Sequence, residues 1–140
     1  MRISFLNSKT PIPLIGFRLP GSNDTHTALV DTGSELTFID KSFVQDNNIK
    51  FTAIDNEVRL NGIVSDTKRK VLIASPTIKF KGKGPKKAMT VKCIVMDLST
   101  LTNALRSEYN EDRHIDMLLG SDFLKENNAY ISYEFKHIDF

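Results

Sequence analysis

The chain is nearly devoid of cysteine. Of its 140 residues only Cys93 is a cysteine, so one chain can form neither an internal disulfide nor a thiolate-rich zinc site. A free cysteine is most often a small buried side chain, and we expect this of Cys93.

Charge of one sign and long apolar runs are missing as well. The 19 basic and 17 acidic residues leave a formal net charge of +2, which creates no overall field that would attract nucleic acid or a membrane surface. No stretch approaches the length of a transmembrane helix, and residues 1–7 contain no apolar core of a signal peptide. We therefore expect a cytoplasmic protein with no nucleic-acid or membrane partner.

What the chain does contain is the composition of a globular domain. With 40% hydrophobic and 26% charged residues, a chain of this length can bury a core of its own, but it leaves little room for two. We predict a single domain over residues 1–140.

Most of the chain reads as short strands between turn-forming residues, which predicts an all-β class with minor helices. The predicted strands cover residues 12–19, 25–30, 36–39, 58–64, 71–80, 89–95, 115–119 and 129–136. Short helices are predicted from about Asp40 or Ser42, over residues 98–109 and over residues 121–127, with Leu98, Leu101, Leu105 and Tyr109 as an apolar stripe.

Turn and cap residues refine this prediction. Residues 20–24 join the first two strands into a hairpin. The polar stretch 65–69 is the expected tip of a second, more exposed hairpin, and we predict that it moves. Ser42 with Gln45 could form a capping box, and Asp122 is expected to cap the last helix.

One carboxylate stands at the end of an apolar strand. In Ala28-Leu29-Val30-Asp31-Thr32-Gly33-Ser34 it directly precedes a glycine and two hydroxyl residues. An aspartate at a strand end can be a simple turn former, and a bare Asp-Thr-Gly can arise by chance. A second motif, Leu118-Leu119-Gly120, follows much later in the chain.

Together, in this order and separation, the two motifs resemble the paired signature of the retropepsin-like aspartic peptidases. The resemblance covers about residues 12–135 in layout. It implies an acid-protease barrel in which the Leu118-Leu119-Gly120 strand threads close to the Asp31 loop and a short helix follows.

The chemistry of such peptidases explains why this chain would act as a dimer. One ionised carboxylate activates a water molecule, while a protonated one polarises the peptide carbonyl. Two carboxylates held close together share a proton, which is the established behaviour of aspartic proteases. The chain has one Asp-Thr-Gly motif, so the second Asp31 would come from a symmetry mate. We predict a homodimer with its active site at the twofold interface.

The resemblance implies roles for further residues. Thr32 would hydrogen-bond across the dimer, and Gly33 would leave room for the approaching backbones. Ser34 would orient the outer oxygen of Asp31. The hairpin from Gly62 to Arg69 takes the place of the flap that closes over bound peptide, although it has a single glycine and several charges. The catalytic candidates are Asp31, Thr32 and Gly33, the substrate-binding candidates are Ser34, Glu35, Gly62, Ile63 and Val64, and the structural motif is Leu118, Leu119 and Gly120.

Competing constellations are weaker. Lys79, Lys81, Lys83, Lys86 and Lys87 could contact phosphate, but only Phe80 is interleaved, so a solvated loop is the simpler interpretation. The three histidines lack metal-ligand spacing. Nothing in the spacing of Asp116, Asp122 and Asp139 demands that they join Asp31 around magnesium. We expect no metal and no cofactor.

The predicted function is an aspartic endopeptidase acting on peptides or proteins. The alternative is a retropepsin-like dimerisation module that has lost turnover and holds a peptide strand by backbone pairing. A metal-dependent hydrolase is a remaining possibility, which sensitivity to chelators would reveal.

Overall fold

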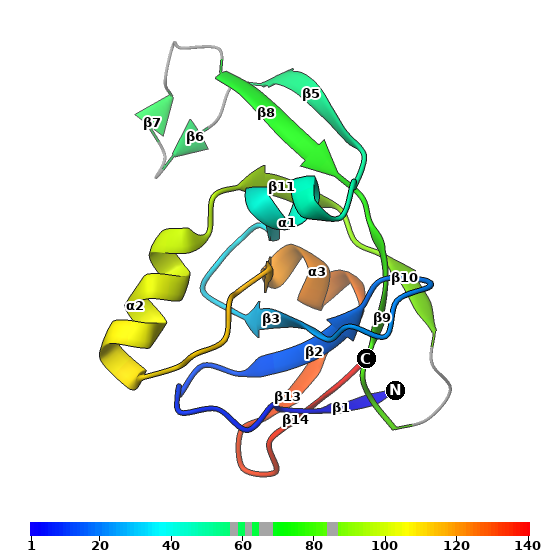
Figure 1. Cartoon of the computed structure of the whole chain (residues 1–140), viewed down its shortest axis with the longest axis vertical. Coiled ribbons are helices and arrows are strands. Elements are labelled where there is room, and N and C mark those ends of the chain that lie inside the picture. Colours follow the sequence, from blue (N-terminus) through cyan, green and yellow to red (C-terminus); the bar gives the residue numbers. More distant parts are fainter. Residues whose placement is uncertain (57–58, 61–62, 65–68, 84–86) are drawn as a thin grey trace.

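The computed structural model describes residues 1–56, 59–60, 63–64, 69–83 and 87–140 (Figure 1). Its strands are β1 (Arg2–Ser4), β2 (Leu14–Arg18), β3 (His26–Val30), β4 (Phe38–Asp40), β5 (Phe51–Asn56), β6 (Arg59–Leu60), β7 (Ile63–Val64), β8 (Arg69–Ala74), β9 (Thr77–Phe80), β10 (Ala88–Thr90), β11 (Cys93–Met96), β12 (Met117–Leu119), β13 (Tyr130–Ser132) and β14 (His137–Asp139). Its helices are α1 (Lys41–Asp46), α2 (Ser99–Tyr109) and α3 (Ser121–Glu126). The predicted class, mostly β with minor helices, is confirmed.

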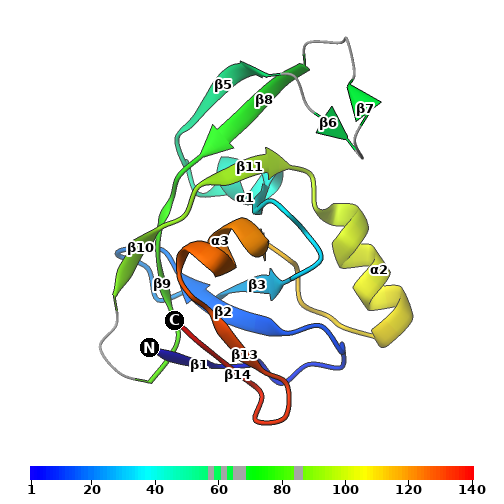
Figure 2. The same ribbon diagram turned by 180° about the vertical axis from the view of Figure 1, so that it is seen from behind.

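One large sheet organises the molecule. Its strand order is β10-β9-β2-β3-β12-β4-β11-β8-β5, and it curls into half of a barrel (Figures 1 and 2). The predicted hairpin of β2 and β3 is confirmed, with Leu14 opposite Leu29 and Phe17 opposite His26. The strand β12 runs parallel to β3 and antiparallel to β4, so it lies between two segments that are much earlier in the chain.

The central strands are buried on both faces. Successive residues of a strand point to opposite faces, and β2, β3 and β12 are buried at nearly every position, as expected for strands covered on both sides. Ile15, Val30 and Leu119 belong to the larger core, whereas Leu29 and Leu118 belong to a second core under α2.

Helix α2 confirms the predicted apolar stripe. Leu98 and Leu105 are buried against the second core, and Leu101 and Tyr109 are partly buried there. Full burial of one such leucine side chain is worth about 1.5–3 kcal/mol. The stripe therefore serves packing, and α2 covers one side of the sheet near the strands that lead to Asp31.

The predicted second hairpin has the wrong partners. The strand β8 pairs with β5, from Phe51 opposite Ala74 to Asn56 opposite Arg69. Residues 51–56 lack a clean apolar–polar alternation, so the sequence analysis did not predict β5. Within the predicted strand 58–64, the described residues form β6 and β7, which pair with each other. The predicted mobile tip lies outside the described residues, apart from Arg69.

Three predicted strands are interrupted. Residues 71–80 break at Pro76, because proline cannot donate to a ladder hydrogen bond, and β9 pairs with β2 and β10 instead. Residues 89–95 divide into β10 and β11. Residues 129–136 end at β13, since Tyr133 and Phe135 lie in a turn and are 58% and 72% exposed.

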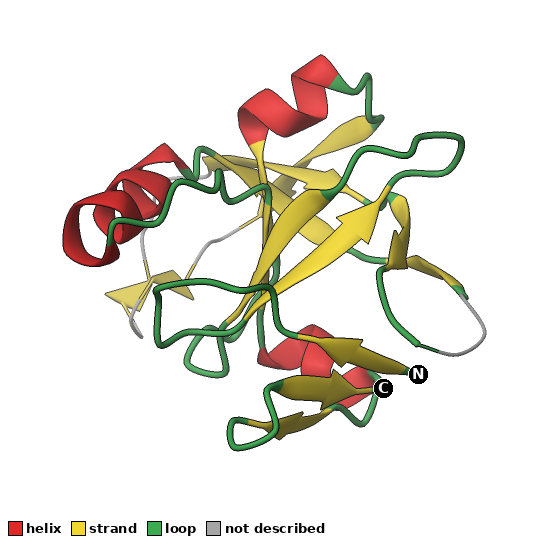
Figure 3. Cartoon of the chain, turned by 60° about the horizontal axis from the view of Figure 1, so that its bottom comes forward, coloured by secondary structure: helices red, strands yellow, loops and turns green. Residues whose placement is uncertain are grey.

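The two chain ends form a separate small sheet of order β1-β14-β13. Ile3 and Ile138 face each other in it and are fully buried. Figure 3 shows these strands beside both termini, close to α3. In the described part of the chain, no helix is both long and apolar enough to cross a lipid bilayer.

Two predicted helix caps are wrong. Helix α1 begins after Asp40, and Ser42 lies inside it, where its hydroxyl donates to the Asp40 carboxylate. Helix α3 begins after Gly120, so Asp122 is its second residue rather than its cap. Instead of capping a helix, Ser42 contacts Asp40 and Asp122 contacts Thr37.

Cys93 is the buried strand residue that was expected, with 1% of its surface exposed. Burial raises the pKa of its thiol to about 12, and the nearby charge of Asp122 adds to the shift. Because the thiolate is the reactive form, Cys93 is inert at neutral pH.

Candidate active site

The loop after β3 holds the Asp31 carboxylate with its own backbone. The N–H of Gly33 donates to Oδ1 of Asp31 at 2.9 Å, and the N–H of Ser34 donates to the Asp31 carbonyl at 3.2 Å. These are the local bonds that aspartate makes at a turn. Asp31 is half-buried, whereas Thr32 and Gly33 beside it are exposed. The loop thus presents one oriented carboxylate at the surface of the molecule.

The Leu118-Leu119-Gly120 segment lies directly against this loop. Leu119 pairs with Val30 in the parallel ladder of β12 and β3. The next bond along, from the N–H of Asp31 to the Leu119 carbonyl, measures 3.0 Å. The two motifs recognised in the sequence therefore meet in space.

Gly120 is required by close backbone approach. A β-carbon on Gly120 would lie 2.2 Å from the carbonyl oxygen of Leu36 and 2.8 Å from that of Ser34. Both atoms belong to the main chain, so neither can swing aside. Any larger residue would push β12 away from the Asp31 loop.

The start of α3 completes the contact between the motifs. The N–H groups of Ser121 and Asp122 donate to the carbonyls of Ser34 and Glu35, at 2.7 and 3.2 Å. The first N–H groups of a helix have no partner within the helix. Here they anchor the second half of the Asp31 loop.

A polar network that the sequence analysis missed lies beneath the loop, with the buried Thr37 at its centre. Thr37 is 1% exposed. Its hydroxyl accepts from the Gly120 N–H at 3.0 Å and donates to Oδ1 of Asp122 at 2.7 Å. The Thr37 N–H also donates to the other Asp122 oxygen, at 3.3 Å. The only signal in the sequence was a threonine within an otherwise apolar strand.

Replacing Thr37 by valine should destabilise the fold by about 1–3 kcal/mol, because it leaves the buried Gly120 N–H without an acceptor. Urea unfolding measures the change. The control is Thr52→Val on the exposed strand β5, which should change the free energy of unfolding by less than about 0.5 kcal/mol. Equal stability of Thr37→Val and the wild type would show that the network does not support the loop.

One predicted contact of the loop is wrong. The hydroxyl of Ser34 donates to the Leu36 carbonyl at 2.8 Å, and not to Asp31. A hydroxyl has a single proton to donate, so it cannot orient Asp31 as a donor in this arrangement. The N–H of Gly33 orients the carboxylate instead.

The other predicted substrate-binding residues do not lie together, and one of them is outside the described residues. Glu35 is exposed at the end of the Asp31 loop. Gly62 lies outside the described residues. Ile63 and Val64 form β7, paired with β6 beyond the arm of β5 and β8 (Figure 2).

A second polar cluster joins the segment before β12 to β4. His114 places Nδ1 at 2.9 Å from Oδ1 of Asp116 and Nε2 at 3.6 Å from Oδ2 of Asp40. The buried Asp40 also accepts from the Leu98 N–H at 2.8 Å. Among the described residues, no group of three or more His, Cys, Asp or Glu side chains is arranged to hold a metal ion.

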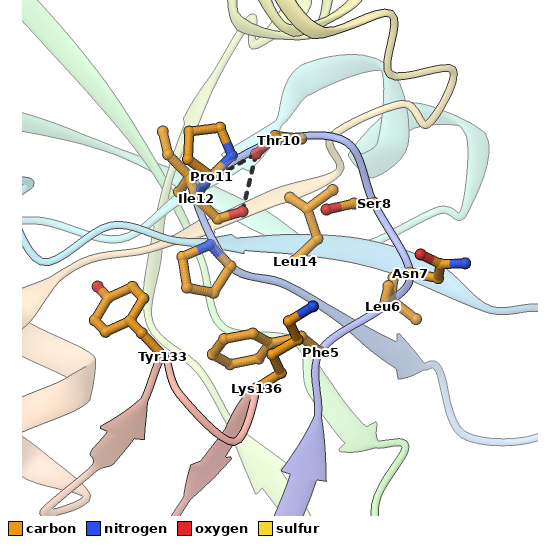
Figure 4. Close-up of a pocket in the computed structure, with 11 residues that line it drawn as sticks. Phe5, Leu6, Asn7, Ser8, Thr10, Pro11, Ile12, Leu14, Tyr133 and Lys136 are labelled. Carbon is orange, nitrogen blue, oxygen red and sulfur yellow. Dashed lines mark hydrogen bonds between the residues drawn. The ribbon is translucent and has the colours of Figure 1, made fainter.

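A cavity of about 370 Å³ lies next to the start of β2, where Leu14 is opposite Leu29 of β3 (Figure 4). It lies between residues 5–14 and the turn that joins β13 to β14. Phe5 and Tyr133 meet edge to face there, with ring centroids 6.4 Å apart, and Lys136 borders the same space. The carbonyl of Pro13, on its wall, accepts from the Val30 N–H at 2.9 Å. The wall of the cavity is therefore bonded to the residue that precedes Asp31.

Comparison with known proteins finds a family and solved structures that are similar to this chain. A family model described as aspartyl protease matches residues 17–123, and this range contains both motifs. No curated protein matches the sequence significantly.

Two solved structures are similar. The retroviral protease-like domain of Ddi1 from Leishmania major is 14% identical, with 85% of this chain and 80% of that chain covered and a TM-score of 0.47. A retropepsin-like aspartic protease from Rickettsia conorii is 17% identical, with 99% and 86% covered and a TM-score of 0.49.

Proposed function

This chain belongs to the aspartyl protease family, and we propose that it is a retropepsin-like endopeptidase that works as a homodimer. The catalytic pair in this proposal consists of Asp31 from each protomer. The substrate is a peptide or protein in extended conformation, bound across the twofold axis.

The observation that carries the proposal is the Asp31 loop itself. Its carboxylate is oriented by the Gly33 N–H, and the loop is anchored to β12 and α3 by backbone bonds. A rigidly supported functional group is what catalysis requires. The sequence contains a single Asp-Thr-Gly motif, so in this proposal the second carboxylate comes from a partner.

The surface around Asp31 suits such a partner. Thr32 and Gly33 are exposed beside the carboxylate, and Leu36, at the other end of the loop, is 46% exposed despite its apolar side chain. An isologous interface would cover the same residues on both protomers. It would bring the two Asp31 carboxylates together at the axis.

In the mechanism we propose, the two carboxyl groups share one proton, so that one is ionised and the other is protonated. The ionised Asp31 takes a proton from water as the water oxygen attacks the peptide carbonyl carbon. The protonated Asp31 of the other protomer gives its proton to the carbonyl oxygen. Collapse of the tetrahedral intermediate breaks the C–N bond, and the leaving nitrogen receives a proton from the pair.

We assign the flap to the arm of β5 and β8. The two strands pair over six consecutive positions, so they form a continuous stem that projects from the sheet (Figure 1). Gly62, Ile63 and Val64 are the proposed contacts with the peptide backbone. Closure of the arm over a bound peptide would exclude water from the cleft.

Cleavage of a complex peptide library, followed by mass spectrometry from acidic to neutral pH, tests the proposal. The number of cuts per protomer should fall when the protein is diluted, because only the dimer contains the catalytic pair. Sedimentation at the same concentrations measures the monomer fraction as the matched control.

Two outcomes would contradict this function. Full activity per protomer where sedimentation shows only monomers would refute the shared site. A folded dimer that makes no cuts would instead support a module that binds peptide without turnover.

A further inference from the structure

A groove runs over the end of the molecule opposite to Asp31. It consists of three adjoining depressions, at residues 18–23 with Lys79, at residues 19–20, 47–49 and 76–77, and at residues 44–45 and 48–52. The first two share Leu19 and Pro20, and the last two share Asn48 and Ile49. We call this surface the outer groove.

The outer groove is separate from the candidate active site. It begins at the turn that precedes β3, whereas Asp31 follows the last residue of β3. A strand of five residues spans about 16 Å. A peptide segment bound in the outer groove is therefore too far from Asp31 to be cleaved there.

One end of the groove is basic. Arg18 and Lys79 are partners on the neighbouring strands β2 and β9, so their side chains project from the same face. Lys81 follows on that face, because a β-carbon on Gly16 would lie 3.3 Å from its Cδ. Among the described residues, no carboxylate forms an ion pair with any of these three cations. Asp24 is exposed in the adjoining turn without pairing to them.

The rest of the groove mixes apolar side chains with polar ones such as Asn47 and Asn48, and Lys50 lies at its far end. Leu19 and Ile49 are only partly buried, and both pack against the main core. Pro76 forms part of the same depression. At the far end Phe51 is 51% exposed. Surfaces of this kind, with apolar area next to a few oriented charges, are typical of binding sites.

We propose that the outer groove is a second binding site, for an extended segment of another protein that carries acidic residues followed by apolar ones. The carboxylates would lie against Arg18 and Lys79, and the apolar side chains would cover Leu19, Ile49 and Phe51. This site goes beyond the proposed peptidase function and does not depend on it.

The chemistry of the groove favours a peptide over nucleic acid. Single-stranded nucleic acid needs aromatic rings on which its bases stack. The aromatic residues of β2 and β9 are Phe17 and Phe80, which face each other in the ladder and are 0% and 1% exposed. Among the described residues that line the groove, the one aromatic ring is Phe51, in the depression farthest from Arg18 and Lys79. The cations therefore have no exposed ring beside them on which a base could stack.

Fluorescence anisotropy with a labelled peptide tests the proposal. The probe carries a block of glutamates followed by leucines, and the protein carries Asp31→Asn so that no cleavage can occur. Binding should weaken with rising salt. The double variant Arg18→Glu, Lys79→Glu should lower the affinity about tenfold, which corresponds to a loss of about 0.7 kcal/mol per cation.

Matched controls separate the site from general charge. The variant Lys41→Glu, Lys125→Glu makes the same charge change at exposed positions in α1 and α3 and should bind within about twofold of the parent. Thermal melting establishes that all variants are folded. A probe in which serines replace the leucines should bind more weakly if the apolar side chains of the groove participate.

Three results would overturn the proposal. The first is no binding of the glutamate–leucine probe, and the second is an equal loss of affinity in both double variants. The third is tighter binding of a single-stranded oligonucleotide of the same charge, which would make the surface a general polyanion site.

Discussion

Replacing Asp31 by asparagine is expected to slow peptide hydrolysis by a factor on the order of 10²–10⁴ without unfolding the protein. Asparagine has nearly the same shape and keeps the oxygen that accepts from the Gly33 N–H at 2.9 Å. It cannot take a proton from water, and in a homodimer both members of the pair change at once. Initial rates on a peptide substrate and urea unfolding measure the two effects.

The matched control is Asp112→Asn, which removes an exposed carboxylate from the segment after α2. This variant should keep the wild-type rate. If a pair of carboxylates shares one proton, the wild-type rate should also be bell-shaped against pH, because both fully protonated and fully ionised pairs are inactive. Wild-type activity in folded Asp31→Asn would place the catalytic group elsewhere.

Replacing Gly120 by alanine is expected to cost about 3 kcal/mol or more of folding free energy, at or above the upper end of the usual range for overpacking. The new β-carbon would lie 2.2 Å from the Leu36 carbonyl oxygen and 2.6 Å from its carbonyl carbon. Because both are main-chain atoms, β12 would have to separate from the Asp31 loop. The midpoint of urea unfolding measures the loss of stability, and any remaining folded protein should have lost activity as well.

Gly21→Ala separates this clash from the general effect of removing a glycine. Gly21 has φ of 77° in the turn between β2 and β3, with no atom within 4 Å of the position of a β-carbon. Its substitution should cost about 1–2 kcal/mol, the penalty for a left-handed backbone. If Gly120→Ala were no more destabilising than Gly21→Ala, the two motifs would not be in the close contact described above.

Local patterns predicted the elements that depend on neighbours in the chain. The turn residues 20–24 identified the hairpin of β2 and β3, because turn chemistry acts over a few residues. The spacing of Leu98, Leu101 and Leu105 identified α2, because one apolar face at helical period is a local property. Both predictions are confirmed.

The partner of each strand was harder to predict. The strands β5 and β8 pair across residues 57–68, and the sequence between them offered a nearer but incorrect partner. Exposure weakens the pattern further, since residues 51–54 are exposed and no buried face imposes an alternation. The same holds for Tyr133 and Phe135, whose apolar side chains suggested a strand face but lie in a turn.

The sequence by itself determined that this chain carries one Asp-Thr-Gly-Ser loop and one Leu-Leu-Gly segment, and hence which family to compare it with. Only the tertiary structure decided that Thr37 and Asp122 join the two motifs, that Ser34 contacts Leu36 rather than Asp31, and that Arg18 stands beside Lys79. The physical reason is that these contacts depend on which strands become neighbours in the sheet. That choice is made by burial and hydrogen bonding over the whole chain, and no local pattern records it.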